Sequence, residues 1–259
     1  ETKLKTVMKK KGFFHAEVRS EVLFPKPKKA VVNYYIRANE PYYIRRVSMD
    51  IPVYEFRKIL IVSMRGNEVK RGMRYDEDLI SEEIGRMTQL LRNEGYYFAN
   101  TSLFYCEVDT IGSNERRDAE GHRTLDLKFV LNTADTAAIE RALYRYYFDK
   151  VSIHTNYNLA YGDGIQYDTT HFFPHRSQND STDYQFLTPR VKEAYGKNGL
   201  PKRDFKFRTI TDKILGKYGK MYSDELNFRT RKGLNDLNNF NTIDSFRNRS
   251  HQLCDCASS

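Results

Sequence analysis

The residues best suited to chemistry lie in one polar segment of the second half of the chain. Five side chains there could bind a metal ion or move a proton: His154, Asp163, Asp168, His171 and His175. Imidazole and carboxylate groups are ligands of zinc, and a zinc-bound water is a hydrolytic nucleophile. His171 and His175 have the spacing that chelates a metal on a helix, but Phe172–Pro174 between them disfavours a helix. A metal-dependent hydrolase is therefore the alternative function, and no catalytic or metal-binding residue is assigned.

Other enzyme motifs are missing from the sequence. Gly162-Asp163-Gly164 indicates a turn, because the lysine and the Ser or Thr of a phosphate-binding loop do not follow it. No serine lies in the glycine-flanked turn that exposes a hydrolase nucleophile. We therefore expect a protein that is not an enzyme and that needs no cofactor.

The net charge of +9 raises the question of a nucleic-acid or membrane partner. The basic residues are spread along the chain, with tight groups only at Lys9–Lys11 and at Lys26, Lys28 and Lys29. Neither zinc-finger spacing nor an aromatic RNA-binding motif accompanies them. We expect no nucleic-acid partner.

Cysteines and hydropathy limit the location only weakly. The three cysteines, Cys106, Cys254 and Cys256, are not a disulfide framework, and Cys106 is expected to be a small buried residue. No apolar stretch approaches the roughly 20 residues that a membrane-spanning helix needs. The chain opens on a charged segment and not on a signal peptide.

Internal repeats are the main signal, and they show which elements carry the candidate residues. Gly12-Phe13-Phe14-His15-Ala16 is echoed 83 residues later by Gly95-Tyr96-Tyr97-Phe98-Ala99, after a helical segment in each case. The turn and helix start at 72–79 are echoed at 219–226, and the strand at 42–48 is echoed at 146–152. Asp76 is a predicted N-cap, and Gly95 a predicted helix end.

These echoes define one unit of β-α-α-β-β order. Its predicted elements are a strand from Tyr42, helices at Tyr54–Met64 and from Asp76, and strands at Tyr97–Asp109 and Thr124–Leu131. Val32, Tyr34 and Ile36 alternate with polar neighbours in the same way in the preceding unit. The order predicts an α/β (α+β) fold of tandem modules, each a small mixed sheet with two helices on one face.

The order and the motifs resemble those of POTRA domains, the periplasmic repeats that precede the membrane barrel in BamA and TamA outer-membrane assembly proteins. The specific part is a motif set spread over the turn, the long helix and its end: Gly72, Tyr75, Leu79, Leu90 and Gly95-Tyr96-Tyr97. The tyrosine-rich style resembles members from Bacteroidetes. The resemblance covers nearly the whole chain.

The resemblance implies four regions. Residues 1–39 form a partial repeat with a second helix and two strands, and residues 40–134 form a complete repeat. Residues 142–247 form a truncated repeat with an insertion at about 158–204, of a length typical of a functional or mobile loop. Residues 248–259 are a polar tail that does not match the pattern.

The resemblance also implies a function. Such a scaffold receives unfolded outer-membrane proteins by strand addition at exposed sheet edges and passes them to a C-terminal barrel that is absent from this sequence. The implied location is the periplasmic side of the bacterial outer membrane, with accessory assembly lipoproteins as further partners and the membrane reached through the barrel. The edge residues expected to contact polypeptide are Phe14, Ala16, Val18, Tyr97, Ala99, Phe104 and Tyr105.

Overall fold

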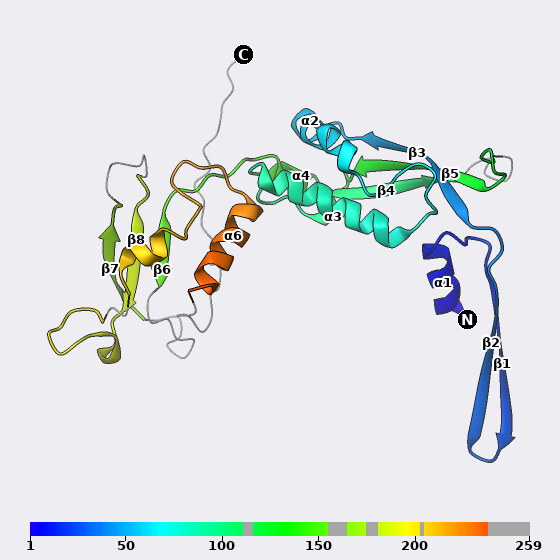
Figure 1. The fold of residues 1–259 in the computed structure, drawn as a ribbon, viewed down its shortest axis with the longest axis horizontal. Helices are drawn as coiled ribbons and strands as arrows, with labels where there is room; N and C mark the ends of the chain where they lie inside the picture. Colours follow the sequence, from blue (N-terminus) through cyan, green and yellow to red (C-terminus); the bar gives the residue numbers. More distant parts are fainter. Residues whose placement is uncertain (111–115, 155–164, 175–180, 203–204, 238–259) are drawn as a thin grey trace. The chain divides into compact units, whose positions relative to one another are not determined.

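The computed structural model describes residues 1–110, 116–154, 165–174, 181–202 and 205–237 (Figure 1). The chain divides into two compact units. The first unit comprises Glu1–Leu91 and Ala99–Ile139, and the second comprises Arg92–Phe98 and the residues from Glu140 onward.

The first unit begins with a helix and a two-stranded hairpin and continues into a complete β-α-α-β-β module. The opening elements are α1 (Thr2–Lys10), β1 (Glu17–Lys26) and β2 (Lys29–Arg37). The module consists of β3 (Tyr42–Asp50), α2 (Tyr54–Ser63), the 3-10 turn η1 (Met64–Gly66), α3 (Glu77–Asn93), the 3-10 turn η2 (Thr101–Leu103), β4 (Phe104–Asp109) and β5 (Arg123–Leu131). The short helix α4 (Thr136–Ala142) follows.

The sheet of this module has the order β3-β5-β4, with β5 parallel to β3 and antiparallel to β4. Alternation along β5 separates its two faces, because successive side chains of a strand point to opposite sides. Leu125, Leu127 and Phe129 are fully buried, as are Phe56 and Leu60 of α2 and Met87 and Leu91 of α3. The fold is thus the α+β module expected from the sequence, with its two helices on one face.

Helix α3 forms where the sequence predicts it. Asp76 accepts a hydrogen bond from the amide of Asp78 at 3.0 Å, which caps the helix start. Ile80, Met87 and Leu91 recur at helical spacing and form its buried face, each at most 5% exposed. Gly95, with φ of +92°, ends the helix in the left-handed conformation that glycine tolerates.

The second unit contains a sheet built in a different chain order. Its elements are β6 (Val151–His154), β7 (Tyr167–Phe172), β8 (Tyr184–Pro189), the 3-10 turn η5 (Lys192–Ala194), α5 (Phe207–Thr211) and α6 (Asp224–Asn235). The order β6-β8-β7 and the strand directions repeat those of β3-β5-β4. The sequence predicts an insertion of loop length at about 158–204. Its described part supplies β7 and β8, so this part is not a loop.

The core of the second unit explains why this segment is ordered. Tyr184 and Phe186 of β8 are 0% and 1% exposed and pack in one cluster with Ile210 and Ile214. Phe186 and Phe207 stack with their ring centroids 3.9 Å apart. Two strands inserted before the helices therefore take the positions that β4 and β5 occupy in the first unit.

One predicted strand is shorter than expected. The sequence predicts a strand over Tyr97–Asp109, but β4 begins only at Phe104, after a turn and η2. Asn100 accepts a hydrogen bond from the amide of Ser102 at 2.9 Å and so favours the 3-10 turn over the strand. No helix of the described residues combines the length and apolarity needed to cross a bilayer.

Candidate functional site

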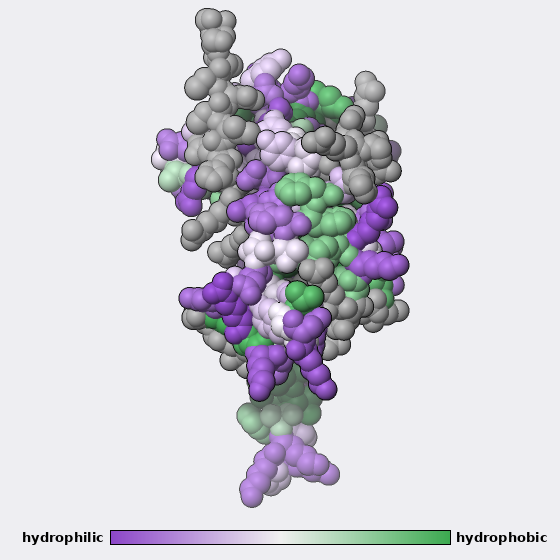
Figure 2. Space-filling model, turned by 90° about the vertical axis from the view of Figure 1, so that its left-hand side faces the viewer, coloured by the Kyte–Doolittle hydropathy of each residue, from purple (hydrophilic) through white to green (hydrophobic). Residues whose placement is uncertain are grey.

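The hairpin β1–β2 exposes an apolar row along one of its faces. Val22, Val32, Tyr34 and Ile36 lie on the same face, because Val22 pairs with Val32 and the other two follow at every second residue. Their exposed fractions are 49%, 46%, 53% and 50%. Figure 2 shows the projecting end of the hairpin at the bottom of the view, apolar residues above a hydrophilic tip. A surface of this kind marks an interaction site.

The main chain on the outer side of β2 is also free to pair. Ser20 of β1 donates its amide hydrogen to a carboxylate oxygen of Glu1 at 2.6 Å, so its main-chain groups point away from β2. Tyr34 pairs with Ser20, so it likewise turns its N–H and C=O outward, as do Val32 and Ile36. In the described part of the chain, β1 is the only strand paired with β2. An extended chain could therefore hydrogen-bond along β2 and lie beside the apolar row.

The outer side of β1 is partly closed. The Glu1 carboxylate accepts hydrogen bonds from both the amide and the hydroxyl of Ser20 and so occupies one position where a guest strand would bind. These bonds hold the pKa of Glu1 below its ordinary value. Pro25 near the end of β1 removes a further donor. The two edges of the hairpin thus differ, and β2 has the accessible one.

The first three predicted contact residues lie mostly outside the edge. Phe14 is in a turn before β1, with its ring 5.2 Å from that of Tyr42 and 5.0 Å from that of Tyr75. Ala16 is 1% exposed and precedes β1, and Val18 is a partly buried residue of that strand. The edge-strand assignment of Phe14 and Ala16 is therefore wrong, because both help to anchor the turn.

The other four predicted residues divide in a similar way. Tyr97 lies in a turn, and Ala99 precedes β4 and is 1% exposed, so neither belongs to an edge strand. Phe104 is in β4, but it is 4% exposed and faces the helices. Tyr105, 43% exposed, is in β4 and accessible. Strand β4 has β5 as its only partner strand among the described residues, which makes its outer side a second candidate edge.

Phe14 and Tyr97 belong to a connection between three backbone segments, and this connection occurs once in each unit. In the first unit, Tyr42 donates its amide to the carbonyl of Gly12 at 3.0 Å and accepts from the amide of Tyr75 at 2.8 Å. In the second unit, Tyr146 makes the matching bonds with Gly95 at 2.9 Å and Tyr222 at 2.7 Å. The Gly-aromatic echo therefore encodes this three-way connection and not a binding edge.

Charged groups support the connection in both units. Lys11 forms ion pairs with Asp76 at 2.9 Å and Asp78 at 2.7 Å. Arg92 binds Asp224, and its guanidinium also donates to the hydroxyl of Tyr222 at 3.1 Å. Burial raises the pKa of Tyr222 to about 12, and the hydrogen bond to Asp224 acts in the same direction.

The residues of the alternative hydrolase do not converge in the described part of the chain. His171 of β7 is bonded to Asp183 at 2.8 Å, and Asp168 accepts from Arg190 and from the hydroxyl of Tyr195 at 2.5 Å each. His154 is on β6, across β8 from both, and burial lowers its pKa. Asp163 and His175 lie outside the described residues. Nothing among the described residues favours this function.

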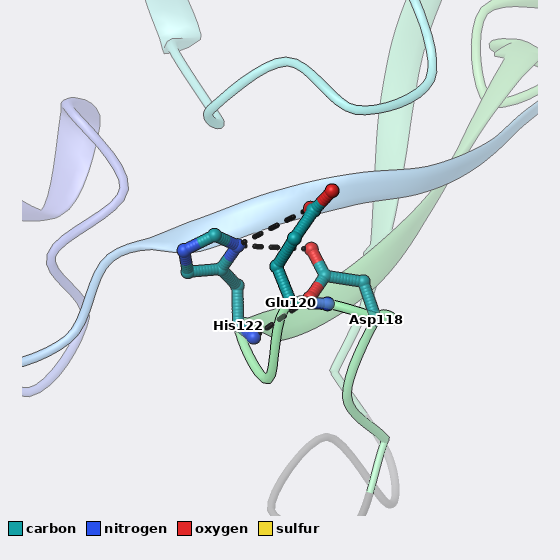
Figure 3. A group of neighbouring side chains, drawn as sticks. All are labelled: Asp118, Glu120 and His122. Carbon is teal, nitrogen blue, oxygen red and sulfur yellow. Dashed lines mark hydrogen bonds and ion pairs between the residues drawn. The ribbon is translucent and has the colours of Figure 1, made fainter.

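A group with metal-ligand chemistry does occur elsewhere, on the turn before β5 (Figure 3). Asp118, Glu120 and His122 bring one ligand atom each within 4.8 Å of the others. However, Asp118 accepts hydrogen bonds from the amides of Glu120 and His122 at 3.1 and 2.7 Å, and His122 rests on the ring of Tyr43. This is the pattern of an aspartate that stabilises its own turn, and the group is largely exposed.

The cysteine in this unit is not a reactive thiol. Cys106 lies in β4, and burial raises its pKa to about 11, so the nucleophilic thiolate is scarce at neutral pH. Cys254 and Cys256 lie outside the described residues.

The fold and the site together define a class: α+β modules with an exposed strand edge, without a catalytic centre in the described residues. No family model and no curated protein matches the chain. Among solved structures, it is similar to the crystal structure of Haemophilus influenzae BamA POTRA3-5, at 12% identity and a TM-score of 0.42. The likeness covers 90% of this chain and 66% of that chain, just under two thirds. A likeness of this degree shows nothing about the roles of individual residues.

Proposed function

We propose that this chain is a polypeptide-binding scaffold that takes up extended segments by adding them as a strand to the outer side of β2. The observation that carries the proposal is the coincidence of unpaired main-chain groups and an apolar row at Val32, Tyr34 and Ile36. A two-stranded hairpin is marginally stable alone in water, so a third strand completes both its hydrogen bonding and its burial.

The ligand is defined by that chemistry. It is an unfolded segment with apolar side chains at every second position, because such a segment presents one apolar face to the hairpin. Affinity from main-chain hydrogen bonds depends little on sequence, which suits a protein that handles many clients. Membrane-barrel strands alternate in this way, so unfolded outer-membrane proteins are the proposed clients.

The cellular setting of the proposal follows from the POTRA resemblance. The chain acts by binding and not by catalysis, at the periplasmic side of the outer membrane, beside a barrel in the same polypeptide. Accessory assembly lipoproteins are proposed partners. Whether the role is BamA-like or TamA-like has no bearing on how the hairpin binds.

The test is binding of a fluorescent peptide with alternating apolar residues to the full chain, measured by anisotropy. Val32→Lys places a charge in the apolar row and should weaken binding about tenfold, since a charge there must be desolvated against the guest. Val62→Lys makes the same change at a residue that is 73% exposed on α2, and should leave binding unchanged.

A third variant locates the edge. Tyr105→Lys alters the outer strand β4, which is the second candidate edge. If Tyr105→Lys abolishes peptide binding and Val32→Lys does not, the site is β4 and the hairpin proposal is wrong. Equal loss of binding in Val32→Lys and Val62→Lys would show that an added positive charge weakens binding wherever it is placed. This result would also contradict the proposal.

A further inference from the structure

A cavity beside β3 collects positive charge on an apolar base. It has a volume of about 440 Å³ and lies between β3 and the loop that follows α2. Four basic residues line it, Arg45, Arg46, Lys70 and Arg71, together with Val47, Met64, Asn67 and Val69. All belong to the first unit, and none is part of the hairpin site.

A β-bulge brings the two arginines to the same side. The register of β3 against β5 shifts between Ile44 and Arg46, so that Arg45 is an extra residue in the strand. Neighbouring residues of a regular strand point to opposite faces, but a bulge re-aims one of them. As a result, both Arg45 and Arg46 reach Asp126, at 2.5 and 3.6 Å.

The charges at the cavity do not balance. Asp126 of β5 does not line the cavity, but it forms ion pairs with both Arg45 and Arg46. The hydrogen bond from Arg45 keeps its pKa below the usual range, so this carboxylate stays ionised and offsets one cation. Lys70 and Arg71 have no carboxylate within ion-pair distance in the described part of the chain. Cations gathered without counter-charges repel one another, and a bound anion would relieve that repulsion.

The loop that presents Lys70 and Arg71 is fixed at both ends. Its start is shaped by Asn67, which is 4% exposed and accepts from the amide of Val69 at 2.7 Å. Its end pairs with β3, since Gly72 donates to the carbonyl of Ile44 at 2.7 Å. The backbone that carries the two cations is therefore held in place, which lowers the entropic cost of ordering the loop on binding.

From this arrangement we infer that the cavity binds a phosphate group attached to an apolar body. Phosphate oxygens accept charge-assisted hydrogen bonds from several lysine and arginine donors at once. The volume exceeds the needs of a lone phosphate, and Val47, Met64 and Val69 offer an apolar wall for the remainder of the ligand. The same chemistry occurs in a phospholipid headgroup and in a soluble phosphate ester. This inference is independent of strand addition at the hairpin.

The experiment compares two double variants of the full chain. Lys70→Gln with Arg71→Gln removes two cations from the cavity. Arg57→Gln with Lys58→Gln removes the same residue types from the exposed side of α2, outside the cavity. Binding is measured to inorganic phosphate by calorimetry, and to phosphatidylglycerol and phosphatidylcholine vesicles by sedimentation.

The inference predicts that the cavity variant binds the phosphate-bearing probe about tenfold more weakly, or worse, while the α2 variant matches the wild type. If that loss occurs with phosphatidylglycerol vesicles, the source is a lipid headgroup; if it occurs with inorganic phosphate alone, the source is a soluble phosphate. Equal weakening in both variants would reduce the effect to net charge and overturn the site. Absence of binding to every probe by the wild type would overturn it as well.

Discussion

At the scale of single residues, the turn glycines show how the repeated motif fixes the backbone. Gly12 has φ of +89°, and a Cβ built on it would lie 2.8 Å from the carbonyl oxygen of Tyr75. Gly72 has a similar φ of +83°, but a Cβ there would meet nothing within 4 Å. The two positions share the left-handed conformation and differ in the space around them.

This difference predicts graded costs of substitution by alanine. Gly72→Ala should lower the free energy of unfolding by about 1–2 kcal/mol, the cost of the left-handed conformation alone. Gly12→Ala should lower it by about 1–3 kcal/mol more, the usual cost of an overpacked site, because the backbone at Tyr75 must move to make room for the added methyl group. Urea unfolding followed by circular dichroism gives both values. Equal losses would show that the contact at Gly12 carries no strain.

At the scale of elements, the sequence predicts a helix or a strand best where its local pattern fits only one of the two. The spacing of Ile80, Met87 and Leu91 with the cap at Asp76 predicts α3, and strict alternation predicts β5. The start of β4 lies later than the sequence predicts, because Asn100 stabilises a turn that competes locally with the strand. Boundaries of this kind depend on one side-chain hydrogen bond, which a periodic pattern does not contain.

The candidate site was only partly predictable for a related reason. The alternation of Val32, Tyr34 and Ile36 predicts a strand, and the exposure of nearly every residue of β2 shows that both of its faces are uncovered. Exposure depends on which other elements cover the face, and that is a tertiary fact. The Gly-aromatic motif gives the opposite error. It suggests that Phe14 and Tyr97 contact polypeptide, but their rings pack within the connection itself.

The segment 158–204 gives the element-scale prediction. Phe186 in the central strand β8 is 1% exposed, so Phe186→Ala should destabilise the second unit by about 3–5 kcal/mol. Phe173→Ala makes the same change at a residue that is 61% exposed just after β7 and should have little effect. Hydrogen exchange at the amides of β6 and β8 measures the loss of protection. Unchanged exchange in Phe186→Ala would mean that the segment is dispensable, as a loop would be.

At the scale of the whole molecule, each of the two units contains one buried tyrosine in the same motif. Tyr75 in the first unit and Tyr222 in the second are 6% and 9% exposed, and burial raises the pKa of each to about 12. A tyrosine of an unfolded chain ionises near pH 10. The folded state therefore binds these two protons more tightly than the unfolded state.

Alkaline pH should then destabilise both units within one window. Below about pH 10 each tyrosine is protonated in both states and its contribution is fully present; the contribution is lost as pH rises through about 12. The loss reaches about 2–3 kcal/mol for each tyrosine, at 1.36 kcal/mol per pKa unit. Tyr75→Phe should flatten the pH dependence of the first unit alone, and Tyr222→Phe that of the second. Hydrogen exchange, followed separately for the amides of each unit across this pH range, measures the loss of stability. Tyrosine ionisation can be followed in parallel by absorbance, because the chain has no tryptophan. An unaltered alkaline slope in the first unit of Tyr75→Phe would show that other groups dominate there.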